Sequence, residues 1–357
     1  MSVLFKPYKV GDLELRNRFM RSATTSYWSD DMGMVKPVII DLYRNLAKGG
    51  VGLIVKGHLY VLDEGKAHKG MAGISHDYHV PKLRELTDIV HMEGGKIVAQ
   101  LNHGGYNSVD RVGPSDYENE RWSARMMDTD EIREVVVAFG DSAGRAMDAG
   151  FDGIQIHGAH GYLVSQFLSR LANRREDEYG GSLENRMRFL NEIYDEVRSR
   201  VGGCVPVMLK LNCDDFSPGG FTIEDSMQVA ESISNRGINL LEVSAGGFDR
   251  REELRYRAKS ENPTLIEADF AGYADQIKKV SSSATIALVS GIRTLTTMQA
   301  LIDEKVTDMI SMSRPFIREP DLVEKMKDGQ EMATCISCGQ CSGREVFSKT
   351  MLRCHLD

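Results

Sequence analysis

The chain has 357 residues, of which 41% are hydrophobic and 27% charged, and its formal net charge is −8. These values are typical of a globular protein with a full core, and the negative charge argues against a general nucleic-acid or membrane-surface binder. No apolar run is long enough for a transmembrane helix and the opening residues, MSVLFKPY, do not resemble a signal peptide, so we expect a cytoplasmic protein.

Eight short apolar segments predict β-strands buried on both faces, because they lack the alternation of a half-exposed strand. They are residues 19–23, 52–55, 97–101, 153–156, 206–211, 240–243, 285–289 and 308–311. Segments with helical spacing lie between them, for example residues 80–93, 131–149 and 184–201. This alternation predicts an α/β fold, a (β/α)8 TIM barrel over residues 1–325. An open doubly wound sheet is the alternative, although no G-x-G-x-x-G follows a strand as a Rossmann domain would require.

Polar residues gather where the predicted strands end, which is where a TIM barrel carries its chemistry. Lys210, near the end of the fifth strand, would be an isolated buried cation unless an anionic ligand accompanied it. Gly291 after the seventh strand and Ser313-Arg314 after the eighth suit a phosphate. Glycine lets backbone N–H groups approach the phosphate, and an arginine guanidinium can donate two parallel hydrogen bonds to its oxygens. The other strand-end residues are Ser22, Thr24, Thr25, Tyr27, Gln100, Asn102, His103, His157, His160 and Tyr162.

Four of the six cysteines form the pattern Cys335-x2-Cys338-x2-Cys341-x12-Cys354. Three closely spaced thiols and a fourth further on are typical of a [4Fe–4S] cluster. In a cytosolic chain such cysteines indicate metal or redox use rather than disulfides. A zinc site and inert buried thiols are the alternatives. We assign residues 326–357 to a short cysteine-rich tail.

The stretch from His157 to Arg188, HGAHGYLVSQFLSRLANRREDEYGGSLENRMR, resembles the central signature of the old yellow enzyme family of FMN-dependent oxidoreductases. Asn17-Arg18-Phe19, Ala99-Gln100-Leu101 and Ser313-Arg314 also fall where that family places them. The resemblance covers about residues 5–325. It implies a TIM barrel that binds FMN across the strand ends, and it does not name the substrate.

The resemblance implies a flavin role for several strand-end residues. Gln100 would hydrogen-bond the pyrimidine ring of FMN, and Lys210 would stabilise the reduced flavin near N1 and O2. Thr25 would adjust the flavin potential from the ring edge. The other implied FMN contacts are Ser22, Ala23 and Gly57 along the isoalloxazine edge, Gly291, Ser313 and Arg314 at the phosphate, and Thr24.

The same resemblance implies the catalytic groups. His157 and His160 would donate hydrogen bonds to a substrate carbonyl, polarising a conjugated C=C bond that receives hydride from the flavin. Tyr162 would supply the proton as general acid, and Tyr27 would line the substrate pocket. The two histidines could instead bind a metal, but no carboxylate accompanies them in the motif. Tyr162 and Tyr27 could instead be packing residues.

Two functions follow from the resemblance. The first is an ene-reductase in which NADH or NADPH reduces FMN, and FMN then reduces a small-molecule alkene conjugated to a carbonyl. The second is an iron–sulfur flavoprotein subunit that exchanges electrons between FMN and an external carrier protein. A catalytically silent, ligand-binding flavoprotein is a weaker third alternative. The candidate protein partners are the external carrier protein of the second function and a second copy of the chain.

The tail also resembles part of larger family members. Trimethylamine dehydrogenase and 2,4-dienoyl-CoA reductase place a [4Fe–4S] cluster directly after the barrel and continue into a second redox half. The present sequence ends at Asp357. We therefore expect that either NAD(P)H reduces FMN at the barrel mouth or a separate protein exchanges electrons through the cluster.

Three loops, residues 57–80, 104–128 and 246–270, carry no motif. His58 and His68 in the first loop could contact an acidic substrate, as could Arg250, Arg251 and Arg255 in the third. We expect instead that all five lie on a solvated surface.

Overall fold

The computed structural model describes residues 2–120, 122–246, 267–281, 283–289, 291–342 and 351–356. Within these residues eight parallel strands close into a barrel, because β14 pairs back to β3 and β3 pairs with β4. The strands are β3 Phe19–Arg21, β4 Leu53–Tyr60, β6 Lys96–Asn102, β10 Ile154–Gly158, β11 Val207–Asn212, β12 Leu240–Ser244, β13 Thr285–Val289 and β14 Met309–Met312. Each overlaps one predicted strand. The predicted (β/α)8 barrel is confirmed, and the open sheet is excluded.

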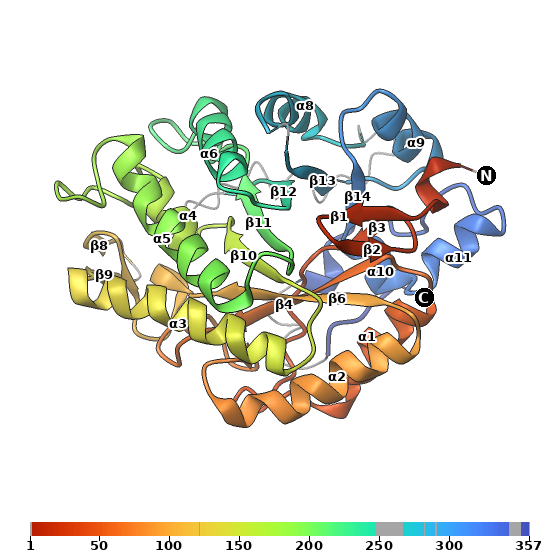
Figure 1. The fold of residues 1–357 in the computed structure, drawn as a ribbon, viewed down its shortest axis with the longest axis horizontal. Coiled ribbons are helices and arrows are strands. Elements are labelled where there is room, and N and C mark those ends of the chain that lie inside the picture. Colours follow the sequence, from red (N-terminus) through yellow and green to blue (C-terminus); the bar gives the residue numbers. More distant parts are fainter. Residues whose placement is uncertain are drawn as a thin grey trace.

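Helices surround the barrel (Figure 1). They are α1 Pro37–Lys48, α2 Val80–Met92, α3 Thr129–Asp148, α4 Leu163–Leu168, α5 Leu183–Val201, α6 Ile223–Asn235, α8 Ala271–Val280, α9 Leu295–Asp303, α10 Arg314–Arg318 and α11 Leu322–Lys327. The predicted helices 80–93, 131–149 and 184–201 correspond to α2, α3 and α5. Asp128 and Glu131 form a capping box at the start of α3, which satisfies N–H groups that the helix itself leaves unpaired.

Short elements lie outside the barrel wall. The hairpin of β1 (Tyr8–Val10) and β2 (Leu13–Leu15) places Val10 and Leu15 in one apolar cluster with the inward-facing Met20, Leu53 and Val55. The hairpin therefore closes one end of the barrel. The remaining short elements are β5 Ala72–Gly73, β7 Val112–Gly113, β8 Tyr117–Glu118, β9 Ser123–Met126, and the 3-10 turns Val3–Phe5, Asp77–His79, Gly105–Asn107 and Gln340–Ser342.

The inside of the barrel changes from apolar to polar along its axis. Val98, Met208 and Leu240 belong to the inner apolar cluster. Successive inward side chains of a strand are two residues apart, so Gln100, Lys210 and Glu242 form the next layer. The strand register places Lys210 directly opposite Glu242. This polar layer lies towards the carboxyl ends of the strands.

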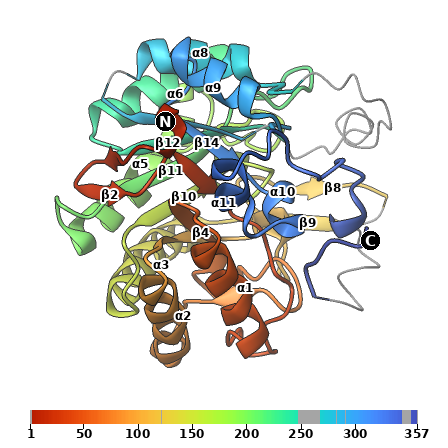
Figure 2. The ribbon, with the colours of Figure 1, turned by 90° about the vertical axis from the view of Figure 1, so that its right-hand side faces the viewer.

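The tail begins packed against the barrel. Met332 forms a β-bridge with Thr294, and the N–H of Ala333 donates to the carbonyl of Arg293. Figure 2 shows the C-terminal end of the chain on the side of the barrel that carries α10 and α11. Among the described residues, no helix combines the length and apolar character that crossing a bilayer requires.

Candidate active site

Lys210 and Glu242 form a buried ion pair in the polar layer. Lys210 Nζ lies 3.4 Å from Glu242 Oε1 and donates a 2.7 Å hydrogen bond to Ser22 Oγ. Burial lowers the pKa of Lys210, and Glu242 counteracts part of that effect. Burial alone would raise the pKa of Glu242, but Lys210 and the hydrogen bonds to the carboxylate bring it below its ordinary value. The expectation that Lys210 would lack a partner without an anionic ligand is wrong, because the chain supplies a carboxylate.

Glu242 also connects Lys210 to Gln100. Ser311 Oγ donates to Glu242 Oε1 at 2.7 Å, and Gln155 Nε2 donates to Oε2 at 3.0 Å. Gln100 Nε2 donates to Gln155 Oε1 at 2.7 Å. The two strand-end residues that the resemblance assigned to the flavin ring therefore belong to one buried network. Glu242, Gln155 and Ser311 were not predicted from the sequence, although polar residues at inward positions of apolar strands were a usable signal.

His157, His160 and Tyr162 lie together just beyond β10. The ring centroid of His157 is 4.9 Å from that of Tyr162 and 5.2 Å from that of His160. His160 adopts a left-handed backbone conformation, with φ of 63°, and its N–H donates to Asn212 Oδ1 at 3.1 Å. Its Nε2 lies 2.8 Å from Ser244 Oγ. The three predicted catalytic residues are thus brought side by side at the carboxyl end of the barrel.

His58 joins this cluster from β4. Its ring centroid lies 5.0 Å from that of Tyr162 and 6.0 Å from that of His157. His58 is 5% exposed, and its Nδ1 and Nε2 lie 2.8 Å from Asn102 Nδ2 and 3.4 Å from His68 Nε2, respectively. The expected solvated surface is therefore wrong for His58. The predicted loop residues Arg250, Arg251 and Arg255 lie outside the described residues.

Burial disfavours the charged form of two histidines in this cluster, His157 and His58. Burial lowers the pKa of His157 and of His58 well below the ordinary value, and the neighbouring basic groups add to the effect. Among the described residues, His157 Nδ1 is a buried nitrogen with no hydrogen-bond partner. Because an unpaired buried polar atom costs free energy, this nitrogen is suited to bind a ligand atom.

The segment after β3 runs past β4 and β14. A Cβ on Gly57 would lie 2.5 Å from Ala23 Cβ, so only glycine allows β4 to approach this segment so closely. Thr24 Oγ1 and Ser313 Oγ are 2.7 Å apart and share a hydrogen bond. The predicted flavin-edge residues therefore lie next to Ser313, which was predicted at the phosphate.

Thr25 and Tyr27 contact His68. Thr25 Oγ1 lies 3.0 Å from His68 Nε2, and the ring of Tyr27 stacks on that of His68 with centroids 4.1 Å apart. Tyr27 has φ of 60°, an uncommon backbone conformation for a residue with a bulky side chain. His68 is only partly buried, so it lies between the buried His58 and the surface.

Gly291 and Arg314 have different surroundings. Gly291 has φ of 56°, and a Cβ placed on it would meet no atom within 4 Å, so the space beside it is open. Arg314 Nη1 donates to the carbonyl of Ser337 at 3.3 Å. Arg314 also lines the cysteine pocket described next. Its contact with the tail was not predicted.

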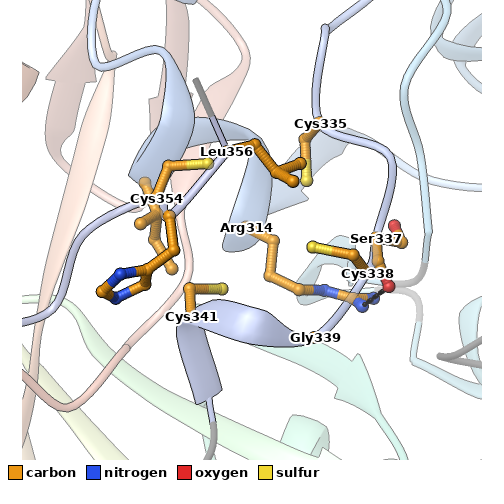
Figure 3. Close-up of a pocket in the computed structure, with 10 residues that line it drawn as sticks. Arg314, Cys335, Ser337, Cys338, Gly339, Cys341, Cys354 and Leu356 are labelled. Carbon is orange, nitrogen blue, oxygen red and sulfur yellow. Dashed lines mark hydrogen bonds between the residues drawn. The ribbon is translucent and has the colours of Figure 1, made fainter. Parts of the chain in front are cut away.

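Cys335, Cys338, Cys341 and Cys354 line a single pocket (Figure 3). Their sulfur atoms point towards its middle, and all four are free thiols. Within the described part of the chain, no group of three or more His, Cys, Asp or Glu side chains is placed to hold a metal ion. The predicted [4Fe–4S] cluster is therefore not shown, and a metal role for the four thiols stays a prediction.

The comparison with protein families identifies the chain. The model of the NADH:flavin oxidoreductase / NADH oxidase family matches residues 3–333. The chain belongs to this family. The chain is 34% identical to an NADH oxidase from Thermoanaerobacter brockii, over 98% of the chain and 55% of that protein. It is 34% identical to an NADPH dehydrogenase from Geobacillus sp., over 89% of the chain and 92% of that protein.

Solved structures resemble the chain over almost its whole length. A 2-naphthoyl-CoA reductase in complex with 2-naphthoyl-CoA superposes with a TM-score of 0.91 at 28% identity, over 99% of this chain and 56% of that one. The old yellow enzyme homologue from Zymomonas mobilis superposes with a TM-score of 0.78 at 25% identity, over 97% and 98%. The old yellow enzyme resemblance is confirmed. The chain spans about half the length of the first curated relatives that it matches.

Proposed function

We propose that the protein takes electrons from NADH or NADPH and reduces a C=C bond conjugated to a carbonyl group. The convergence of His157, His160 and Tyr162 beside the buried Lys210–Glu242 pair carries the proposal. FMN, when bound, supplies the electron pair to the alkene as hydride.

The residues at the strand ends fit FMN. Lys210 is a buried cation whose charge would favour a reduced, anionic flavin, and Gln100 offers an amide in the same network. Open space beside Gly291 suits a phosphate, since among the described residues no atom lies within 4 Å of a Cβ placed there. We assign the remaining FMN contacts to Ser22, Ala23, Thr24, Thr25, Gly57, Ser313 and Arg314.

The substrate groups act through hydrogen bonds. In the tautomer that carries its hydrogen on Nδ1, His157 donates to the substrate carbonyl oxygen and stabilises the negative charge that develops there. His160, held by Ser244 and Asn212, is the second donor. Tyr162 transfers its phenol proton to the carbon next to the carbonyl. Tyr27 lines the pocket.

Reduction of the flavin by the nucleotide and its reoxidation by the alkene can be measured separately. NADH or NADPH should bleach the flavin absorbance anaerobically, and cyclohexenone should restore it. Tyr162→Phe should slow reoxidation by about 100-fold, which is typical of a lost general acid, and leave bleaching unchanged. A wild-type flavin that neither nucleotide bleaches would refute this function.

A second candidate function has its own supporting observation, the four-cysteine pocket. In this proposal Cys335, Cys338, Cys341 and Cys354 hold a [4Fe–4S] cluster, through which the FMN exchanges electrons with a carrier protein. The shielding of Cys335 and Cys341, 8% and 9% exposed, supports a bound cluster. Anaerobic purification followed by iron and acid-labile sulfide analysis tests it. A content far below one cluster per chain, after iron and sulfide have been supplied, would contradict it.

A further inference from the structure

Two arginines of α10 hold the tail against the barrel. Arg314 and Arg318 are one helical turn apart, so both reach the same side of α10. Arg314 donates to the carbonyl of Ser337, between the first two cysteines of the pocket. Figure 3 shows Arg314 reaching into the pocket among the four thiols.

Arg318 contacts both ends of the cysteine pattern. Its Nε donates to Thr334 Oγ1 at 2.9 Å, directly before Cys335. Its Nη1 lies 3.3 Å from Cys354 Sγ and donates to the carbonyl of Leu356 at 3.0 Å. One planar guanidinium thus joins the start of the tail to the segment that carries the fourth cysteine.

The side-chain charge around the pocket would favour a negatively charged group. Among the described residues that line the pocket there is an arginine but no carboxylate. Glu319, which follows Arg318, accepts hydrogen bonds from the N–H of Thr334 at 2.7 Å and from Gln330 Nε2 at 2.9 Å. Four thiolates around an iron–sulfur core carry net negative charge, so the arginines would offset it.

We propose that Arg318 is a positioning residue for the cluster, and that its hydrogen bond to the Cys354 sulfur helps to set the cluster's potential and retention. The inference rests on the proposed [4Fe–4S] site. A hydrogen bond withdraws electron density from a thiolate and so favours the reduced cluster. Because the same side chain also holds Thr334 and Leu356, its loss should loosen the fourth ligand.

The experiment compares Arg318→Gln and Arg318→Lys with wild type. The midpoint potential of the cluster is measured by an anaerobic titration followed by EPR, and iron release to a chelator is followed by absorbance. We expect Arg318→Gln to have a more negative potential and to release iron roughly tenfold faster, as is typical when a group behind a metal ligand is removed. Arg318→Lys keeps the positive charge but loses the planar guanidinium. Its cluster potential and its rate of iron release should therefore lie between those of wild type and Arg318→Gln.

Arg188→Gln is the matched control, because Arg188 on α5 also donates to a backbone carbonyl, that of Glu178. FMN content and circular dichroism verify folding in each variant. If Arg318→Gln has the same cluster potential and rate of iron release as this control, the positioning role of Arg318 is refuted. The proposed [4Fe–4S] site is not affected by that result. A wild-type chain that binds no iron and sulfide would refute both. Flavin bleaching by NADH or NADPH tests the FMN function separately.

Discussion

Lys56 on β4 is a fully buried lysine. Its Nζ lies 5.6 Å from the ring centroid of Tyr43 and 3.4 Å from the carbonyl oxygen of Gly57. Among the described residues no ion pair joins it to a carboxylate, in contrast to Lys210. Burial lowers the pKa of Lys56 to about 7. The residue therefore costs the fold stability at neutral pH and has no part in the proposed chemistry.

Replacing Lys56 with methionine should stabilise the protein. The folded-state pKa lies below that of the unfolded chain, so between about pH 7 and 10.5 the unfolded chain binds more protons and the free energy of unfolding rises with pH. Lys56→Met removes this penalty and should gain roughly 4 kcal/mol at pH 7, but much less at pH 10. Urea unfolding of both proteins at the two pH values measures the difference. An equal gain at both would show that charge burial is not the cause.

Among the elements, β4 shows best what the sequence predicted and what it did not. The apolar run predicted a strand over residues 52–55, whereas β4 covers Leu53–Tyr60, because Lys56 and His58 interrupt the run although both are buried. The prediction matched β13, whose residues 285–289 are uninterrupted. The burial of polar strand residues depends on partners from other elements, such as Asn102 for His58. For the same reason His58 was wrongly expected on a solvated surface and Glu242 was not predicted, while the signature motif identified His157, His160 and Tyr162 as candidates.

Helix α3 should depend on its first residues. The Asp128 carboxylate accepts from the N–H of Glu131 at 2.9 Å, and Glu131 Oε2 accepts from the N–H of Asp128 at 2.9 Å. Asp128→Ala should cost about 1 kcal/mol, because the N–H of Glu131 loses its side-chain acceptor. Asp130→Ala is the control, since Asp130 makes an exposed ion pair with Arg133 and should cost less than about 0.5 kcal/mol. Denaturant unfolding compares the two. Equal losses would rule out the cap as the cause.

Across the whole molecule, the apolar packing and the predicted catalytic residues lie at opposite ends of the closed barrel. The hairpin of β1 and β2 and the apolar layer fill one end, while the ion pair and the ring cluster occupy the other. The polar end buries several histidines as neutral groups. Its structure should therefore be the part of the fold most sensitive to acid.

The whole protein should lose stability as the pH falls from about 6.5 to 4. Burial lowers the pKa of His103 to about 4, and the pKa values of His58 and His157 also lie well below the unfolded value of 6.5. In this window the unfolded chain binds more protons, so the free energy of unfolding rises with pH and is lost on acidification. Each buried histidine can contribute up to about 2 kcal/mol between pH 7 and pH 5. Urea unfolding at both pH values measures the total loss. His103→Gln, which does not titrate, should reduce that loss by about 1 to 2 kcal/mol, and a variant that keeps the full loss would show that His103 is not among its causes.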